Sequence, residues 1–300
     1  MMSGFPRLQA EEELALPPPP QHRGIKKGLY LIPSLFTAAN IAMGFFAVMS
    51  ALRGFQLLGS GREESMARAP VFFDNAAIAI GWAMLFDTLD GRIARMTRTT
   101  TEIGIQFDSI ADVLTFGIAP AVLAYTWGYG SAFQEGTDAH KLGWFLSFMY
   151  LMCGAFRLAR FNVQATRPRT LAEGTPKVDK NYFIGLPIPM AAAAIAAIVH
   201  FAPQPLAQYE PGRAKLYSGL IMALVACLSA LMISTLRYSS FKSVGTRRGS
   251  TRLVILLVAA IGMLIWLYSH YVMLALASAY VLHGLLFRLG AFFSKSGDKD

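Results

Sequence analysis

The chain carries the stretch DTLDGRIARMTRTTTEIGIQFDSIAD at residues 87–112, between two long apolar runs. Four aspartates lie where those runs end: Asp87, Asp90, Asp108 and Asp112. A carboxylate next to hydrocarbon is costly, so acidic residues at such places are usually functional. At helical spacing the first two aspartates share one helix face, and the last two share one face of the next helix. The stretch therefore predicts two antiparallel helices that direct four carboxylates into one cavity.

The rest of the chain has the composition of a membrane protein. Of its 300 residues, 54% are hydrophobic and 15% are charged, and the mean hydropathy is +0.44. These values exclude an ordinary soluble domain and a disordered chain. We expect an all-α fold, a polytopic transmembrane helix bundle of about eight spans, because each span needs about 20 apolar residues. The expected spans cover residues 31–52, 71–89, 103–127, 142–159, 183–201, 216–236, 253–268 and 271–289.

Three regions are expected along the chain. Residues 1–23 are acidic and proline-rich, which predicts a disordered cytosolic tail. Residues 24–251 form the membrane domain, and its first segment, basic and apolar together, suits the headgroup level. Residues 252–300 form a transmembrane hairpin and a short tail, because only two residues separate the last two spans. The two cysteines lie within apolar runs, which excludes a disulfide framework and a thiolate zinc site.

The basic residues indicate how the bundle is oriented. With eight spans, 21 lysines and arginines lie on the side of both termini and six lie on the other side. The positive-inside rule then places both termini and the aspartate-bearing helix ends on the cytoplasmic side of the inner membrane. The net charge of +9 is explained by these loops and an anionic lipid surface, so no nucleic-acid partner is expected.

The aspartates favour hard divalent cations as ligands. The stretch 87–112 contains no cysteine or histidine, and an oxygen-only donor set favours Mg²⁺ or Mn²⁺. Four ionised carboxylates repel one another, and two such ions would compensate them and suit a displacement at phosphorus. In the alternative interpretation the aspartates form ordinary salt bridges with the three arginines of the same stretch. Their alignment on one helix face argues against that alternative.

Eight positions of this stretch resemble the complete signature of the CDP-alcohol phosphotransferase family. They are Asp87, Asp90, Gly91, Ala94, Arg95, Gly104, Asp108 and Asp112. The resemblance implies an integral membrane enzyme with a six-helix core and a polar cavity that faces the cytoplasm. Such enzymes transfer a substituted phosphate from a CDP-linked donor to an alcohol and release CMP.

The resemblance also implies roles for single residues. Asp87, Asp90 and Asp108 would bind two divalent cations, and Asp112 would complete the metal site and act as the general base. No side chain resembles a covalent nucleophile with its own base, so direct in-line displacement is expected. Residues 33–40 resemble the family's opening Pro-Asn-x-x-Thr-x-x-Asn, with serine in place of the first asparagine. The implied CDP-binding residues are Thr37, Asn40, Gly91, Ala94, Arg95 and Gly104.

Three further segments resemble the membrane-embedded phosphatidylserine synthases of this family, at residues 156–163, 183–189 and 231–242. This branch implies CDP-diacylglycerol and L-serine as substrates, and homodimers are common in the family. The carboxylate of serine requires a fixed cation, and arginine binds a carboxylate with two hydrogen bonds. The candidate serine ligands are Arg157, Arg160, Arg237 and Lys242.

Two alternatives remain open from the sequence. The same chemistry suits another acceptor, such as glycerol 3-phosphate or an inositol phosphate. An ion-coupled transporter would also carry intramembrane carboxylates. Against the transporter, the clustered acids lie at one membrane face, with no chain of carboxylates leading to the other.

Overall fold

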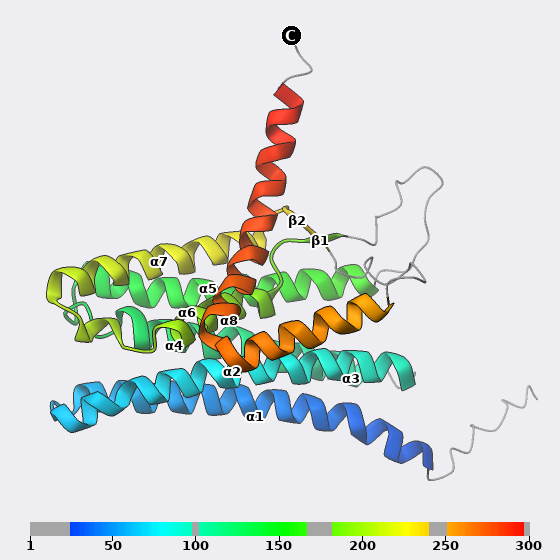
Figure 1. The fold of residues 1–300 in the computed structure, drawn as a ribbon, viewed down its shortest axis with the longest axis horizontal. Coiled ribbons are helices and arrows are strands. Elements are labelled where there is room, and N and C mark those ends of the chain that lie inside the picture. The colour runs from blue at the N-terminus through cyan, green and yellow to red at the C-terminus, as the bar shows by residue number, and fades with distance from the viewer. Residues whose placement is uncertain (1–24, 98–101, 167–181, 240–250, 297–300) are drawn as a thin grey trace, which may run out of the picture.

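The computed structural model describes residues 25–97, 102–166, 182–239 and 251–296, and these ranges are almost wholly helical (Figure 1). The expected tail at residues 1–23 lies outside the described residues, as does Lys242. The helices longer than ten residues are α1 (Ile25–Gly59), α2 (Glu63–Thr97), α3 (Glu102–Asp112), α5 (Asp138–Thr166), α6 (Ile188–Phe201), α7 (Pro211–Ile233) and α8 (Thr251–Ser296).

Within the described residues, seven helices are long and apolar enough to cross a membrane, which confirms an all-α polytopic bundle. The number is one below the expected eight, and the expected spans 253–268 and 271–289 both lie within α8, where two helical parts meet at a kink. Only Tyr268 leaves helical geometry there, with φ −137° and ψ 45°. Helix α8 changes direction sharply at this kink (Figure 1). The transmembrane hairpin expected at residues 252–300 stays a prediction.

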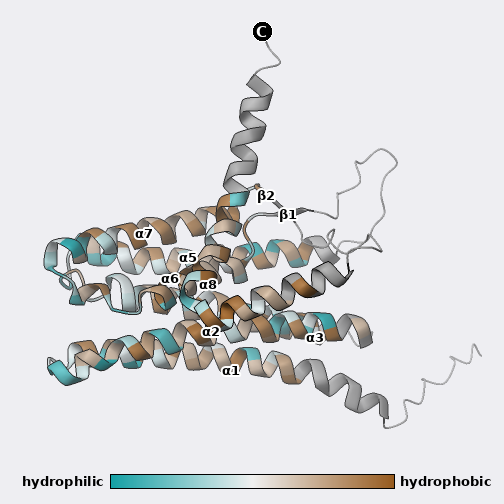
Figure 2. Cartoon of the chain, viewed as in Figure 1, coloured by the Kyte–Doolittle hydropathy of each residue, from teal (hydrophilic) through white to brown (hydrophobic). Residues whose placement is uncertain are grey.

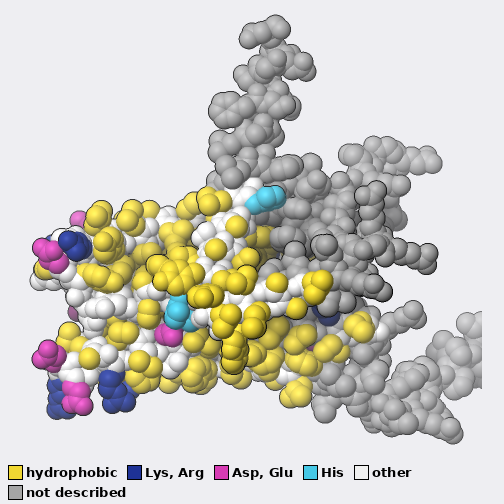
Figure 3. Space-filling view, in the orientation of Figure 1, with side chains coloured by type: hydrophobic (Ala, Val, Ile, Leu, Met, Phe, Trp, Pro, Cys, Tyr) yellow, Lys and Arg dark blue, Asp and Glu magenta, His cyan; other side chains and the backbone are white. Residues whose placement is uncertain are grey.

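The outer surface of the bundle suits a lipid environment. Large apolar side chains are exposed on several helices, among them Phe45 of α1, Trp82 of α2, Trp144 of α5 and Leu220 of α7. Hydrophobic residues follow the helices along their middle parts, whereas hydrophilic residues gather at the loops of one end (Figure 2). In a space-filling view the same face is mostly hydrophobic, with charged side chains grouped at that end (Figure 3). The lipid tails would cover the apolar part of this surface.

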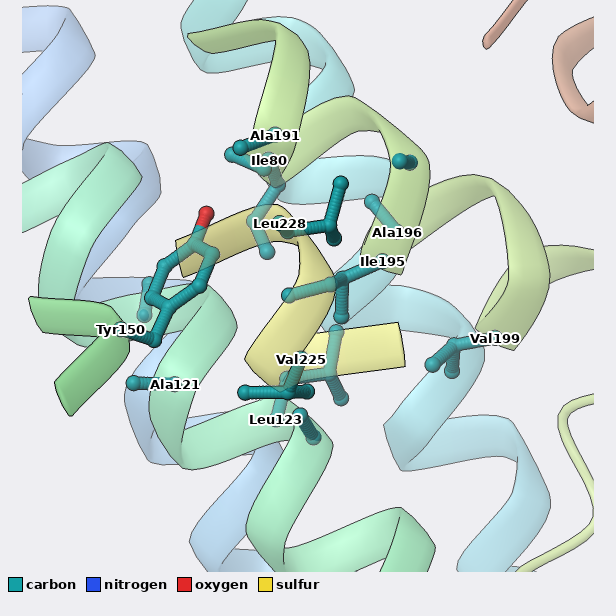
Figure 4. Packing of buried hydrophobic residues seen from close by; sticks show 14 of the residues in the cluster. Ile80, Ala121, Leu123, Tyr150, Ala191, Ile195, Ala196, Val199, Val225 and Leu228 are labelled. Atoms are coloured by element: carbon teal, nitrogen blue, oxygen red, sulfur yellow. The ribbon is translucent and has the colours of Figure 1, made fainter. Parts of the chain in front are cut away.

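Helix α6 lies at the centre of the bundle. Its span has the largest buried share of the seven, 61%, and a run of alanines makes it narrow. Small side chains let neighbouring helices approach closely, which is how transmembrane helices pack without a hydrophobic driving force. Figure 4 shows Ala191 and Ile195 of α6 beside Ile80 of α2 and Leu228 of α7, all of them buried.

The entry into α6 differs from the predicted span at residues 183–201. Tyr182–Ile184 forms a short strand, β1, which pairs antiparallel with β2 (Arg237–Ser239). Gly185 follows with φ +78°, and its N–H donates to the carbonyl oxygen of Leu236 at 2.8 Å. Pro187 then precedes the first helical turn with extended backbone (φ −59°, ψ 138°). The helix begins five residues late because positive φ and an extended proline interrupt helical geometry.

The third predicted span is helical throughout but not uniformly α-helical. After α3 come a π-helical segment, Val113–Ile118, the short helix α4 (Ala119–Leu123) and a second π-helical segment, Ala124–Tyr129. Such π-helical insertions are rare and often occur at functional sites. The first one begins directly after Asp112. It packs so closely on α1 that a Cβ added to Gly44 would lie 2.5 Å from Oγ1 of Thr115.

The turn before α6 yields a stability prediction. We expect Gly185→Ala to lower the free energy of unfolding by about 1–3 kcal/mol, the cost of a strained positive-φ residue. The Cβ of an alanine at position 185 would also lie 2.5 Å from the carbonyl oxygen of Met232. The measurement is the thermal unfolding midpoint of the purified protein in detergent. The control is Gly219→Ala in α7, where no atom lies within 4 Å, and equal midpoints for both variants would contradict the prediction.

Candidate active site

Helices α2 and α3 bring three of the four predicted aspartates together. One carboxylate oxygen from each of Asp87, Asp108 and Asp112 lies within 4.8 Å of the other two, and all three side chains are half-buried. The buried Oδ1 of Asp112 has no hydrogen-bond partner among the described residues. Three carboxylates at this separation repel one another, and burial strengthens the repulsion. The group therefore suits a bound cation.

Asp90 lies beside this group rather than within it. Its side chain is 6% exposed and accepts a hydrogen bond from Oγ1 of Thr37, which α1 supplies. It also interacts electrostatically with Asp87 and Asp108. Thr37 is thereby linked to the carboxylates, and its role in binding the donor stays a prediction. Direct metal ligation by Asp90 stays a prediction.

Asn40 follows Thr37 by one turn of α1 and is fully buried. Neither Oδ1 nor Nδ2 of its amide has a hydrogen-bond partner within the described part of the chain. Thr115, on the π-helical segment after Asp112, donates a hydrogen bond to the backbone carbonyl of Asn40 at 3.3 Å. A buried polar group without a partner costs about 1–3 kcal/mol. An amide held in that condition beside the carboxylates suits a residue that binds a polar ligand.

Helix α5 supplies one predicted arginine to the site. Arg157 is 8% exposed and interacts electrostatically with Asp112, and its Nε has no hydrogen-bond partner among the described residues. Arg160, one turn further along α5, is less buried, and its Nη1 donates to the backbone carbonyl of Ile233 at 3.4 Å. Of these two arginines, Arg157 is thus the one that interacts with the aspartate group.

For the other predicted site residues within the described ranges, the structure describes the backbone but not every side chain. Gly91 of α2 and Gly104 of α3 are exposed, so both faces are accessible to a ligand. Ala94 and Arg95 lie within α2, but their side chains are outside the described residues. The backbone of Arg237 belongs to β2, and its side chain is also outside the description. The proposed roles of these residues stay predictions.

Three residues near the site were not predicted from the sequence. Gly44 permits the close packing of α1, and Thr115 binds the backbone of Asn40. Tyr280 of α8 interacts electrostatically with Arg157. Thr115 follows Asp112 by three residues, so both lie near one face of the helix. This spacing could have indicated Thr115 from the sequence. Tyr280 is more than 100 residues from Arg157 in sequence, and no sequence pattern connects the two.

The donor set fits a divalent metal ion. Carboxylate oxygens are the ligands that hard cations prefer, and the partnerless Oδ1 of Asp112 has a lone pair to offer. Helix α1 adds Thr37, which bonds Asp90, and the buried amide of Asn40 one turn further along. The arrangement can therefore hold a cation and an anionic ligand next to a carboxylate that accepts a proton.

Comparisons with known proteins identify the family. The model of the CDP-alcohol phosphatidyltransferase family matches residues 30–231. The chain is 34% identical over 222 residues to a Helicobacter pylori protein named CDP-diacylglycerol–serine O-phosphatidyltransferase, which covers 72% of this chain and 75% of that protein. Proteins of the same name from Saccharomyces cerevisiae and Bacillus subtilis are 33% and 28% identical, over 60% and 70% of this chain and 56% and 91% of their own lengths. The chain belongs to the CDP-alcohol phosphatidyltransferase family.

Proposed function

We propose that this protein transfers the phosphatidyl group of CDP-diacylglycerol to the hydroxyl of L-serine and releases CMP. The observation that carries the proposal is the group of three carboxylates, Asp87, Asp108 and Asp112, with Arg157 beside it. The names of these relatives give the same donor and acceptor for proteins that match most of this chain. A multi-pass membrane protein is also suited to a donor whose acyl chains stay in the bilayer.

The cofactor in this proposal is a pair of Mg²⁺ or Mn²⁺ ions. Asp87, Asp108 and Asp112 would hold them, with Asp90 beside them on the same face of α2. When bound, the ions neutralise the negative charge of the donor's pyrophosphate and of the departing CMP. Thr37 and Asn40 would bind polar atoms of the donor from α1, and the close packing of that helix at Gly44 keeps them in place.

Asp112 is the general base in this mechanism. Its carboxylate takes the proton of the serine hydroxyl while the serine oxygen attacks the phosphorus that carries the diacylglycerol. The new bond joins the serine oxygen to that phosphorus, and the bond from the phosphorus to the CMP oxygen breaks. A positioned base of this kind contributes about 10²–10⁴-fold to a reaction rate. Arg157 interacts electrostatically with this carboxylate.

Arg157 is the proposed anchor for the serine carboxylate. It is buried next to Asp112, so an acceptor bound to it has its hydroxyl near the base. Arg160, Arg237 and Lys242 are the further candidates. Glycerol 3-phosphate, a dianionic acceptor, would need more positive charge at this place than serine does.

The orientation proposed from the basic residues puts both termini and the active site on the cytoplasmic side. Soluble serine is then available to the site, and CMP leaves into the cytoplasm. The homodimer that the family resemblance implies stays a prediction.

The first catalytic prediction concerns Asp112. We expect Asp112→Asn to lower serine-dependent CMP release by at least about 10²-fold, because the amide cannot accept the proton. The assay combines purified protein, CDP-diacylglycerol, Mn²⁺ and serine. The matched control is Asp138→Asn at the exposed start of α5, where the side chain only pairs with Lys141 at 3.6 Å. Activity in Asp112→Asn equal to that of the control would contradict the assignment.

The same assay tests the acceptor and the class of protein. We expect CMP release with serine and none with glycerol 3-phosphate or an inositol phosphate. Release that depends on one of those alcohols instead would replace the acceptor and leave the chemistry unchanged. No release with any alcohol would favour the transporter.

The second catalytic prediction concerns serine binding. We expect Arg157→Lys to raise the KM for serine about tenfold or more, since a hydrogen bond to a charged group contributes about 1.5–3 kcal/mol. Lysine keeps the positive charge but lacks the planar fork that binds a carboxylate with two hydrogen bonds. The KM for CDP-diacylglycerol, which does not use that fork in this proposal, should change much less. The control is Arg213→Lys, whose exposed side chain lies 3.7 Å from Glu210. An unchanged KM for serine would refute the role of Arg157.

The proposed orientation is tested at the two ends of α2. In a Cys227→Ser background, Glu63→Cys and Met96→Cys each place one exposed thiol at opposite ends of the same helix. On intact cells, a membrane-impermeant maleimide should label Glu63→Cys at once and Met96→Cys only after permeabilisation. The reverse pattern would place the active site on the outer side.

A further inference from the structure

A second polar cluster connects α2, α6 and α8, apart from the proposed catalytic group. It consists of Asp74, His200 and His270, and one ligand atom from each lies within 4.8 Å of the others. Asp74 and Asp87 are 13 residues apart on α2, so the two clusters are separated by roughly 20 Å along the helix. Figure 3 shows histidine and acidic side chains next to each other on a mostly hydrophobic face.

The cluster lies at a depth where charge is costly. Val71 and Ile78 of α2, on either side of Asp74 in sequence, are 60% and 41% exposed on the surface that suits lipid. A carboxylate at such a level needs a positive partner, and in membrane proteins it usually marks a functional site. The proposed transferase reaction has no role for these three residues.

The hydrogen bonds around the two histidines match those of metal-binding imidazoles. Nδ1 of His270 donates to the backbone carbonyl oxygen of His200 at 2.5 Å, which leaves its Nε2 with a lone pair. Nε2 of His200 lies 2.9 Å from Oγ of Ser269, and its Nδ1 lies 2.5 Å from Oδ1 of Asp74. A histidine that binds a metal through one nitrogen almost always bonds a carbonyl, carboxylate or water through the other. For His270 that outer partner is the carbonyl of His200, and for His200, binding through Nδ1 beside Asp74, it is the hydroxyl of Ser269.

The ring geometry limits the positive charge that the two histidines can carry. An ion pair between a protonated His200 and Asp74, with His270 neutral, is the alternative to a bound metal ion. The two imidazoles stack with centroids 4.1 Å apart and an interplanar angle of 21°, an arrangement in which two protonated rings would repel. A bound cation uses both rings in their neutral form.

We infer that Asp74, His200 and His270 form a binding site for a transition-metal ion of the Zn²⁺ type, which fastens the kinked helix α8 to α2 and α6. Two imidazole nitrogens and one carboxylate oxygen are a usual ligand set for Zn²⁺, whereas Mg²⁺ prefers oxygen ligands alone. His270 is exposed, so the fourth position is open to water or another ligand. The site is chemically distinct from the aspartate group, and it does not depend on the proposed transferase activity.

The test measures metal binding directly. The full chain is purified with a tag that contains no histidine, stripped with a chelator and placed in lipid nanodiscs. Co²⁺ is then titrated as a spectroscopic substitute for Zn²⁺, with excess Mg²⁺ present to occupy the catalytic aspartates. We expect one bound Co²⁺, with the intense visible absorption of a four-coordinate site. Zn²⁺ should displace it and raise the thermal unfolding midpoint, because an ion that binds only the folded state stabilises it.

Four variants distinguish this site from other metal binding. Asp74→Asn and His270→Ala should weaken Co²⁺ binding by at least about tenfold, the scale on which even outer partners of metal ligands act. Ser269→Ala should cause a smaller loss. The control is His140→Ala, at a histidine whose ring contacts Tyr125 in another part of the protein.

Retained CMP release shows that a variant is folded, and the exposed position of His270 favours an intact fold for His270→Ala. Equal Co²⁺ affinity in all four variants would overturn the inference. The absence of saturable binding to the unmodified chain would overturn it as well. Either result leaves the proposed transferase activity unaffected.

Discussion

The free-energy cost of keeping several carboxylates together beside hydrocarbon is the constraint on which this structure depends. Asp87, Asp108 and Asp112 come within 4.8 Å of one another in a bundle whose surface is largely apolar. Bound cations would compensate the negative charge of that arrangement. The same need explains why the group suits a phosphotransferase, since ions that satisfy the carboxylates also attract a nucleotide pyrophosphate. Structure and chemistry thus follow from one electrostatic requirement.

The surrounding helices hold the aspartate group in a polar environment. Helix α1 packs on the π-helical segment after Asp112 closely enough that only glycine fits at position 44. This contact brings the polar side chains of Thr37 and Asn40 to the acidic group. Helix α5 adds Arg157 from the other direction. The alanine-rich helix α6 supports the arrangement, because its small cross-section lets the outer helices pack around one centre.

Helix α2 carries two acidic positions with different partners. Asp87 lies among carboxylates, which favours hard ions, whereas Asp74 lies among imidazoles, which favours a softer one. Asp87 connects the consecutive helices α2 and α3, whereas Asp74 connects α2 to the distant helices α6 and α8. The two clusters thus differ in their ligand atoms, carboxylate oxygens in one and mainly imidazole nitrogens in the other, although both contain an aspartate of α2.

The sequence by itself determined the membrane bundle and the aspartate signature, because hydropathy and helical spacing are local properties that need no knowledge of packing. It also singled out Thr37, Asn40 and Arg157, which the structure brings to the site. Only the tertiary structure decided that Asp90 faces Thr37 while three other aspartates meet, that α8 kinks at Tyr268, and that Asp74, His200 and His270 converge. The histidines are 70 residues apart in sequence and more than 100 from Asp74, and such contacts depend on how helices pack, which no local pattern encodes.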